Sequence, residues 1–139
     1  MAAVSDRIVL TDMVFQARHG VAEWEKVEPQ PFAVGQGIAE EKVCLDPGIG
    51  FGKTPEQNVE VLRNLGRLRE LERPILLGTS RKSTLGLVLD LPPDQRLEAT
   101  LATTVLGVAA GADMVRVHDV QANARAARMA DAVVRGWRR

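Results

Sequence analysis

Residues 43–58 read VCLDPGIGFGKTPEQN, and this stretch decides how the chain is expected to fold. Its first residues are apolar and begin with a β-branched side chain, which is typical of a buried strand. A helix is predicted from Thr54, because Pro55 suits a first helical turn and Gln57 lies at capping-box spacing. The stretch therefore predicts a strand, a glycine-rich loop and a helix, in that order.

The glycines of this loop also suggest a nucleotide-binding phosphate loop, since Gly-Lys-Thr occupies positions 52–54. That motif needs Gly-x-x-x-x-Gly-Lys-[Ser/Thr], and so a glycine at position 47. Pro47 stands there instead, and proline has no amide hydrogen to donate to a phosphate. A dinucleotide fingerprint fails as well, because Gly48, Gly50 and Gly52 give G-x-G-x-G. The remaining interpretation is a glycine-rich backbone without side chains, which lets a flat ligand approach the end of the strand.

Alternation of strands and helices continues to the C-terminus. Apolar runs at 73–80 and 112–119 predict two further strands. The apolar residues of the three predicted helices are Val59, Leu62 and Leu65; then Leu97, Leu101, Val105 and Val108, with a stop at Gly111; then Ala126, Ala130, Val133 and Trp137, within 121–137. Such alternation predicts an α/β fold of parallel strands joined by right-handed crossovers and covered on both faces.

The first 34 residues follow a different pattern. Residues 7–17 alternate between apolar and polar like a long strand, and 18–32 read as a polar turn or helical segment. The sequence Gly-Gln-Gly at 35–37 lies between the two parts. We therefore expect a short β-rich segment over 1–36 and a second domain over 37–139.

Composition excludes several classes of function. The 139 residues carry 18 basic and 18 acidic side chains, and this balance argues against nucleic-acid or polybasic membrane partners. No run of about 18 apolar residues predicts a membrane span. Cys44 is the one cysteine, so neither a disulfide framework nor a thiolate metal cluster is expected. The expected location is the cytoplasm.

Each predicted strand ends in polar or charged residues. Asp46 ends the first, Ser-Arg-Lys-Ser at 80–83 follows the second, and Arg116 and His118 share one face of the third. In a (β/α) barrel the carboxyl ends of the strands are where sites are built. Plainer interpretations also exist for single features: a turn at Asp46, a solvated loop at Arg81 and Lys82, a structural His118, a core Cys44, and a solvated helix end at 135–139. Three such strand ends together favour a site.

Residues 37–135 resemble the C-terminal part of bacterial dihydropteroate synthases, through the motifs GIAEEKVCLDPGIGFGKT, GTSRKS and RLEATLATTVLGVAAGADMVRVHDV. The resemblance implies a transferase of folate biosynthesis. Such enzymes condense 4-aminobenzoate with 6-hydroxymethyl-7,8-dihydropterin diphosphate and release 7,8-dihydropteroate and diphosphate. The family fold is an eight-unit (β/α) barrel of the TIM type. The expectation is therefore a partial barrel made of the last three units.

The resemblance also implies roles for individual residues. Asp46 would accept hydrogen bonds from the 2-amino and N3–H groups of the pterin. Lys82 would donate to the ring oxygen and nitrogen, and Arg116 and His118 would hold the diphosphate, so these three form the expected catalytic set. The remaining substrate-binding residues implied are Phe51, Arg81, Ser83 and Val117. The family uses Mg²⁺, but the part that supplies its protein ligand has no counterpart here, and a homo-oligomer is a possible assembly.

Residues 6–34 resemble the start of dihydroneopterin aldolases. The residues at family spacing are His19, Gly20, Val21, Glu25, Gln30 and Phe32, and Glu25 matches an active-site glutamate. The chain would then join pieces of two folate-pathway proteins, and three parallel strands cannot close a barrel. Three hypotheses follow: a dihydropteroate synthase, a non-catalytic remnant that binds pterin or diphosphate, and an aldolase-like assembly. No turnover is expected from the chain alone.

Overall fold

The structure of the protein is a computed structural model, and it describes residues 8–11 and 34–137. The elements, with η marking 3-10 helices, are β1 (Ile8–Thr11), η2 (Glu40–Lys42), β2 (Val43–Asp46), α2 (Pro55–Arg63), η3 (Leu65–Leu71), β3 (Leu76–Leu77), α3 (Ser83–Leu89), η4 (Pro93–Gln95), α4 (Leu97–Ala110), β4 (Met114–Val115) and α5 (Val120–Arg135). The predicted alternation of strands and helices after residue 43 is confirmed. The short helix α3, which contains Gly86, was not predicted from the sequence.

The four strands of the described residues run parallel. β1 pairs with β2, so that Thr11 lies opposite Asp46, and β3 pairs with β4. A single bridge between Leu45 and Ile75 joins the two pairs and places the strands in the order β1-β2-β3-β4. The predicted parallel strands within 43–46, 73–80 and 112–119 are confirmed, although β3 and β4 are shorter than predicted. β1 comes from the segment expected to form a separate domain, and that expected boundary remains a prediction.

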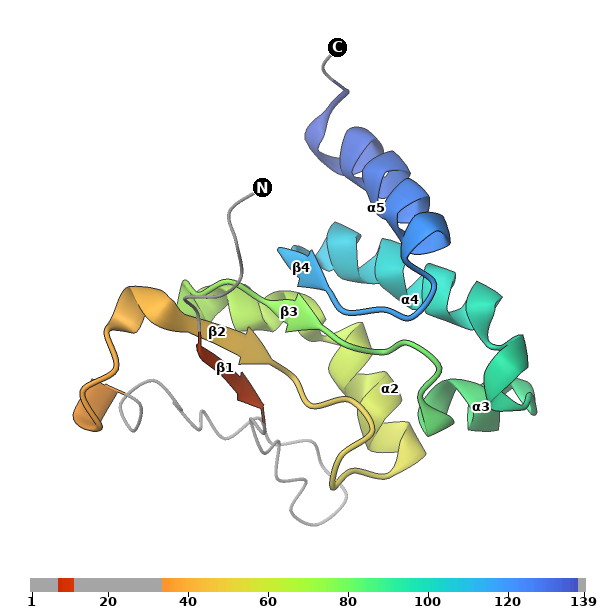
Figure 1. Ribbon diagram of the computed structural model, residues 1–139, viewed down its shortest axis with the longest axis horizontal. Coiled ribbons are helices and arrows are strands. Elements are labelled where there is room, and N and C mark those ends of the chain that lie inside the picture. Colours follow the sequence, from red (N-terminus) through yellow and green to blue (C-terminus); the bar gives the residue numbers. More distant parts are fainter. Residues whose placement is uncertain (1–7, 12–33, 138–139) are drawn as a thin grey trace.

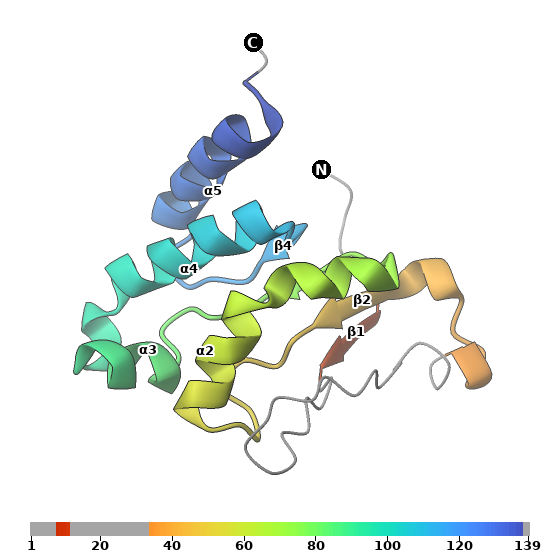
Figure 2. The same ribbon diagram turned by 180° about the vertical axis from the view of Figure 1, so that it is seen from behind.

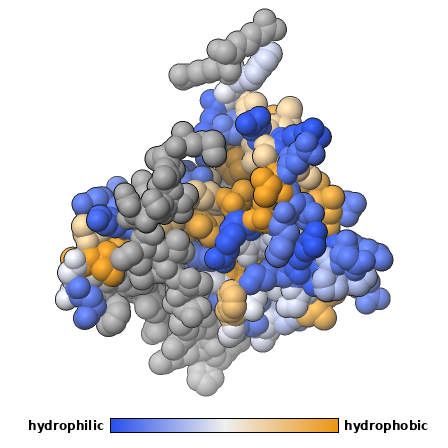
Figure 3. Space-filling view, viewed as in Figure 1, coloured by the Kyte–Doolittle hydropathy of each residue, from blue (hydrophilic) through white to orange (hydrophobic). Residues whose placement is uncertain are grey.

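The helices α2, α4 and η3 lie on one face of the strands, and α5 lies alongside α4 (Figures 1 and 2). Between strands and helices is an apolar core of Val43, Leu45, Ile49, Val61, Leu65, Leu68, Ile75, Leu77 and Ala112. Burying each large aliphatic side chain stabilises the fold by about 1.5–3 kcal/mol. The face of the strands opposite these helices is the one seen in Figure 3. It has apolar surface near its centre, close to the edge strand β4.

The start of α2 fixes the glycine-rich loop. Thr54 Oγ1 accepts a hydrogen bond from the Gln57 amide at 3.3 Å, and Gln57 Oε1 accepts from the Thr54 amide at 2.9 Å, which confirms the predicted capping box. Asn58, one turn further, is buried. Its Oδ1 accepts from the Gly50 amide at 2.8 Å, and its Nδ2 donates to the Thr54 carbonyl at 2.9 Å. The loop is therefore tied to the helix that follows it.

The buried face of α4 differs from the predicted one. Thr100, Thr104, Gly107 and Val108 are buried, whereas Val105, predicted on the buried face, is 39% exposed. Hydrogen bonding explains the two threonines, because the Thr100 hydroxyl donates to the Arg96 carbonyl at 2.8 Å and the Thr104 hydroxyl to Asn123 Oδ1 at 2.7 Å. Close packing explains why glycine occupies buried position 107, since a Cβ there would come within 2.4 Å of Leu77 Cδ2.

The C-terminal helix ends earlier than predicted. α5 stops at Arg135, and Gly136 has a φ of 87°, a conformation that ends helices and that glycine adopts easily. Ala130 is buried as expected, but Val133 and Trp137 are each 72% exposed, so the predicted apolar stripe is buried only in part. Over residues 8–11 and 34–137, no helix combines the length and apolar character needed to cross a membrane.

Candidate functional site

The carboxyl end of β2 carries a buried carboxylate. Asp46 is 1% exposed. Its Oδ1 accepts a hydrogen bond from the Gly48 amide at 2.9 Å, and its Oδ2 accepts one from Arg116 Nη2 at 3.3 Å. A carboxylate can accept about four hydrogen bonds, so each oxygen retains capacity for a second donor. Asp46 can therefore receive two parallel N–H groups of a ligand.

Arg116 reaches Asp46 from two strands away. It follows β4, and its guanidinium crosses the backbone directly after β3, at Gly78, where a Cβ would stand only 3.0 Å from Nη2. A side chain at position 78 would thus push the guanidinium away from Asp46. The Arg116 side chain is 56% exposed, so the ion pair is open to solvent on one side. Arg116 and Asp46 connect the rim from β4 to β2.

Lys82 stands between these groups and an exposed aromatic ring. Its stem lies against Gly50, where a Cβ would come within 3.1 Å of Lys82 Cδ, and its ammonium is 3.8 Å from the centre of the Phe51 ring. The pKa of Lys82 is lowered, chiefly by desolvation and also by the charge of Arg116, while Asp46 acts in the opposite direction. Lys82, Arg116 and Asp46 therefore form one electrostatic cluster.

The turn that carries Lys82 has an unusual backbone. The Lys82 amide donates to the Thr79 carbonyl at 3.1 Å, and Arg81 between them has a φ of 57° in the left-handed region. The Arg81 guanidinium forms a fork with Asp119, through Nε to Oδ2 at 3.2 Å and Nη2 to Oδ1 at 2.8 Å. The sequence suggested Arg81 as a ligand-shaping residue, but did not suggest Asp119. The position of Asp119 immediately before α5 was the feature of the sequence that could have indicated it.

Ser80 sets the orientation of His118. The His118 amide donates to Ser80 Oγ at 3.1 Å, and Ser80 Oγ lies 2.9 Å from His118 Nδ1. Because Ser80 Oγ already accepts the amide hydrogen, its own hydrogen is available to Nδ1. This arrangement favours the tautomer with a hydrogen on Nε2, which then serves as a donor. Ser80 was absent from the residues predicted to bind substrate.

The other predicted residues lie beside this cluster or outside the described residues. Ser83 begins α3 and is exposed, and Val117 is half-buried between Arg116 and His118 in the chain. Glu25 and the other aldolase-like positions lie outside the described residues. Within the described ranges, no three His, Cys, Asp or Glu side chains converge in a way that could hold a metal ion. The Mg²⁺ implied by the resemblance stays a prediction.

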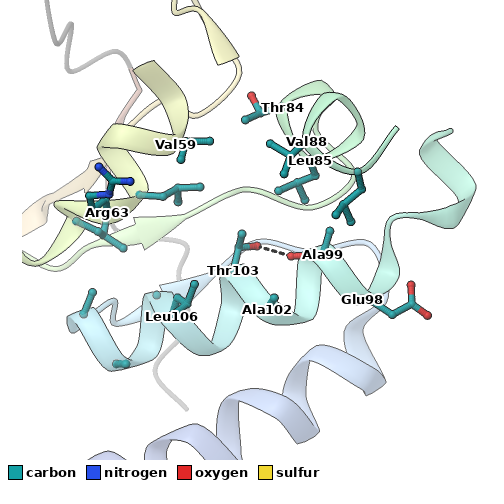
Figure 4. A pocket seen from close by; sticks show the side chains of 16 residues that line it. Val59, Arg63, Thr84, Leu85, Val88, Glu98, Ala99, Ala102, Thr103 and Leu106 are labelled. Atoms are coloured by element: carbon teal, nitrogen blue, oxygen red, sulfur yellow. Dashed lines mark hydrogen bonds between the residues drawn. The ribbon is translucent and has the colours of Figure 1, made fainter. Parts of the chain in front are cut away.

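A separate apolar groove lies among the helices. Its volume is about 840 Å³, and it is lined by residues of α2, η3, α3 and α4. Figure 4 shows Val59 of α2 and Val88 of α3 facing the side of α4 that carries Ala102 and Leu106. The groove contains few polar side chains, and so differs in chemistry from the cluster at the strand ends.

Parallel strands with a charged cluster at their carboxyl ends define a class of α/β proteins that bind ligands at that rim. Residues 16–118 match the family model of pterin binding enzymes, and the chain belongs to this family. The match begins inside the segment 6–34 that resembles aldolases, and that second resemblance stays a proposal.

Individual relatives are dihydropteroate synthases. The chain is 60% identical over 100 residues to the dihydropteroate synthase of Clostridium beijerinckii, covering 71% of this chain and 37% of the relative. Identity to the Bacillus subtilis enzyme is 49% over 108 residues, covering 78% and 38%. A crystal structure of the Clostridium difficile enzyme in the presence of pteroic acid superimposes with a TM-score of 0.73 at 59% identity, covering 76% of this chain and 40% of that one. The chain thus spans less than half the length of these relatives.

Proposed function

We propose that the chain supplies the pterin- and diphosphate-binding rim of a dihydropteroate synthase, the transferase that joins 4-aminobenzoate to 6-hydroxymethyl-7,8-dihydropterin diphosphate. The observation that carries this proposal is the cluster of Asp46, Lys82 and Arg116 at the carboxyl ends of adjacent strands. A carboxylate and two cations are the groups that a ring with N–H donors and an anionic substituent require. The family membership supports the same substrate class.

Asp46, Lys82 and Phe51 would bind the ring. The carboxylate of Asp46 would accept from the 2-amino and N3–H groups, and the Lys82 ammonium would donate to the ring oxygen. The Phe51 side chain is 47% exposed and provides a flat apolar surface next to that ammonium. Such contacts orient the methylene carbon of the substrate relative to the incoming amine.

Arg116 and His118 would hold the diphosphate, and the Lys82 ammonium, whose charge interacts with Arg116, would add positive charge next to it. In the proposed reaction the amine nitrogen of 4-aminobenzoate forms a bond to the methylene carbon, and the carbon–oxygen bond to diphosphate breaks. The diphosphate leaves with the electron pair, and the amine loses a proton. Donors from Arg116 and from Nε2 of His118 stabilise the charge that develops on the leaving oxygen.

Titration calorimetry with 6-hydroxymethyl-7,8-dihydropterin diphosphate tests the proposal. Lys82→Ala is expected to lower the affinity roughly tenfold or more, because a charge-assisted hydrogen bond contributes about 1.5–3 kcal/mol. Lys42→Ala is the matched control, since Lys42 is an exposed lysine directly before β2, at the opposite end of that strand. The control is expected to bind like the unmodified chain. No binding by the unmodified chain would contradict the proposal.

A non-catalytic protein that binds pterin or diphosphate is the second candidate function. The observation that favours it is that Asp46, Lys82 and Arg116 provide groups that bind a ring and an anion. Both candidates predict binding, and turnover separates them. Incubation of the purified chain with both substrates and Mg²⁺ is expected to yield no measurable 7,8-dihydropteroate. Formation of that product would favour the complete transferase.

An aldolase-like role for residues 6–34 is a further proposal, and it rests on sequence alone. Glu25 would be the active-site glutamate. Because most of this segment lies outside the described residues, activity provides the test. Cleavage of dihydroneopterin by the chain that disappears in Glu25→Gln would support the role, and absence of cleavage in the unmodified chain would refute it.

We also propose that the chain forms a homo-oligomer. Within the described part of the chain β4 pairs only with β3, and an open strand edge can pair with another copy of the chain. Sedimentation equilibrium is expected to show an assembly larger than one chain, and a monomeric unmodified chain would refute this proposal.

A further inference from the structure

Arg96 is bound to the turn that carries Lys82. It precedes α4, and its Nη1 donates to the carbonyl oxygens of Arg81 at 3.0 Å and Lys82 at 3.3 Å. Its Nε donates to the Leu91 carbonyl at 2.9 Å. The guanidinium lies directly on Gly86, where a Cβ would stand 2.1 Å from Nη2. One side chain therefore joins the turn, α3 and the segment that follows α3.

The turn needs such support because its conformation is intrinsically unfavourable. Arg81 has a φ of 57°, and the left-handed region is disfavoured for residues with a Cβ. The first turn of α4 also holds the same residue from its other side, since the Arg81 amide donates to Thr100 Oγ1 at 3.3 Å. A hydrogen bond from Arg96 thus fixes the Arg81 carbonyl, and the hydrogen bond that Arg81 donates to Thr100 Oγ1 fixes its amide.

The position of Lys82 depends on this turn. Its ammonium lies over Phe51, and its charge interacts with Arg116 and Asp46. A rotation of the peptide between Arg81 and Lys82 would redirect the whole Lys82 side chain. Since the acceptors of Arg96 are backbone carbonyls, Arg96 acts on the rim through Lys82.

We propose that Arg96 is a positioning residue, which holds Arg81 of the turn 79–82 in its left-handed conformation. It thereby places the Lys82 ammonium where it can bind a ring and an anion. The part of this inference that concerns ligands rests on the function proposed above. Arginine suits the task because its planar fork donates to several carbonyls at once, whereas lysine offers a single compact ammonium.

Two variants remove or displace the Arg96 guanidinium. Arg96→Ala removes it. Gly86→Ala leaves it in the chain but places a methyl group where it lies, and alanine is a better helix former than glycine within α3. A loss of ligand binding in Gly86→Ala without a loss of fold would therefore separate mispositioning from unfolding. Arg96→Lys completes the set and is expected to restore binding in part.

Matched controls exist at the other end of α4. The guanidinium of Arg69 lies on Gly111, where a Cβ would come within 2.3 Å of Arg69 Nη1, so Arg69→Ala removes a guanidinium that also covers a glycine. Gly66→Ala adds a methyl group at a position where it meets only the Ala110 carbonyl at 3.5 Å. Neither residue contacts the turn 79–82, and both variants are expected to bind like the unmodified chain.

The experiment measures two quantities on the full chain. Titrations with 6-hydroxymethylpterin and with inorganic diphosphate give dissociation constants, and ¹⁵N–¹H spectra report the amides of Arg81 and Lys82. If the turn keeps its conformation about one tenth of the time in Arg96→Ala, both apparent affinities fall about tenfold. Gly86→Ala is expected to follow in the same direction, with displaced Arg81 and Lys82 amide signals.

The outcomes distinguish this inference from the proposed function. Unchanged Arg81 and Lys82 amide signals in both Arg96→Ala and Gly86→Ala would overturn the positioning role, as would affinities within twofold of the unmodified chain. An equal loss in Arg69→Ala would overturn it too. If the unmodified chain binds neither probe, the proposed function fails, and the amide signals alone then decide whether Arg96 holds the turn.

Discussion

Asp46→Asn should weaken pterin binding and strengthen diphosphate binding. In the protein without ligand, Asp46 Oδ2 holds Arg116 Nη2 at 3.3 Å. Diphosphate alone must draw Arg116 away from this partner. An asparagine retains an oxygen for the Gly48 amide, but it presents no negative charge to the guanidinium. The substitution therefore releases Arg116 while it removes the charge that would bind the ring.

The two effects have different magnitudes. The Arg116 side chain is 56% exposed, and ion pairs that solvent reaches contribute only about 0–1 kcal/mol. Release of this pair should raise the diphosphate affinity by up to roughly fivefold. For the ring, loss of charge-assisted hydrogen bonds to a carboxylate costs about 1.5–3 kcal/mol. The affinity for 6-hydroxymethylpterin should fall by roughly ten- to a hundredfold.

Titration calorimetry with each ligand alone measures both changes. Asp113→Asn is the control, because it removes the same charge at the opposite end of the sheet, where Asp113 Oδ2 accepts from the Ile75 amide at 2.9 Å. It should leave both affinities unchanged. A fall in diphosphate affinity in Asp46→Asn would refute the competition between Asp46 and the anion for Arg116.

Three further predictions concern charge and stability. The lowered pKa of Lys82 means that the folded chain binds fewer protons than the unfolded chain between that pKa and the ordinary lysine value, so this group should add stability as the pH rises through that window. Titrations with diphosphate should lose affinity over the same window. A diphosphate affinity that is constant up to the ordinary lysine pKa would contradict the role of Lys82. Arg116→Ala should weaken diphosphate binding by roughly 1–3 kcal/mol, and calorimetry at increasing salt should show the binding of the unmodified chain weakening because the site is open to solvent. Thr104→Val should lower the free energy of unfolding by about 1–3 kcal/mol, because it leaves buried Asn123 Oδ1 without the hydrogen bond from the Thr104 hydroxyl. Urea denaturation measures this change, and an unchanged midpoint would contradict a stabilising role of that hydrogen bond.

Local signals in the sequence predicted much of the fold. The capping box at Thr54 and Gln57 and the stop at Gly111 depend on residues within a few positions of each other, so they can be read without tertiary structure. The parallel order of the strands follows from their alternation with helices. For the same reason the sequence placed Asp46, Lys82 and His118 at one rim, although their roles remain predictions.

Other features depend on contacts between distant segments. The sequence assigned ring and diphosphate to separate residues, whereas Asp46 and Arg116 contact each other across β3. Nothing local marks Arg96 as the partner of a turn at residues 79–82, since its acceptors lie up to fifteen residues earlier. The apolar spacing of α4 does not predict that Thr100 and Thr104 are buried, because a hydrogen bond such as that from Thr104 to Asn123 of α5 does not show in a hydrophobic pattern.

The order of the strands sets how readily each part of the rim opens. Within the described part of the chain, β2 has a neighbour on both sides, β1 and β3, whereas β4 pairs only with β3. Amide hydrogen exchange should therefore be slower in β2 than in β4, because edge strands open with a lower free energy. Arg116 and His118 follow the edge strand, and Asp46 ends the inner one. Transient local unfolding would then detach the anion-binding half of the rim while the ring-binding carboxylate stays in place.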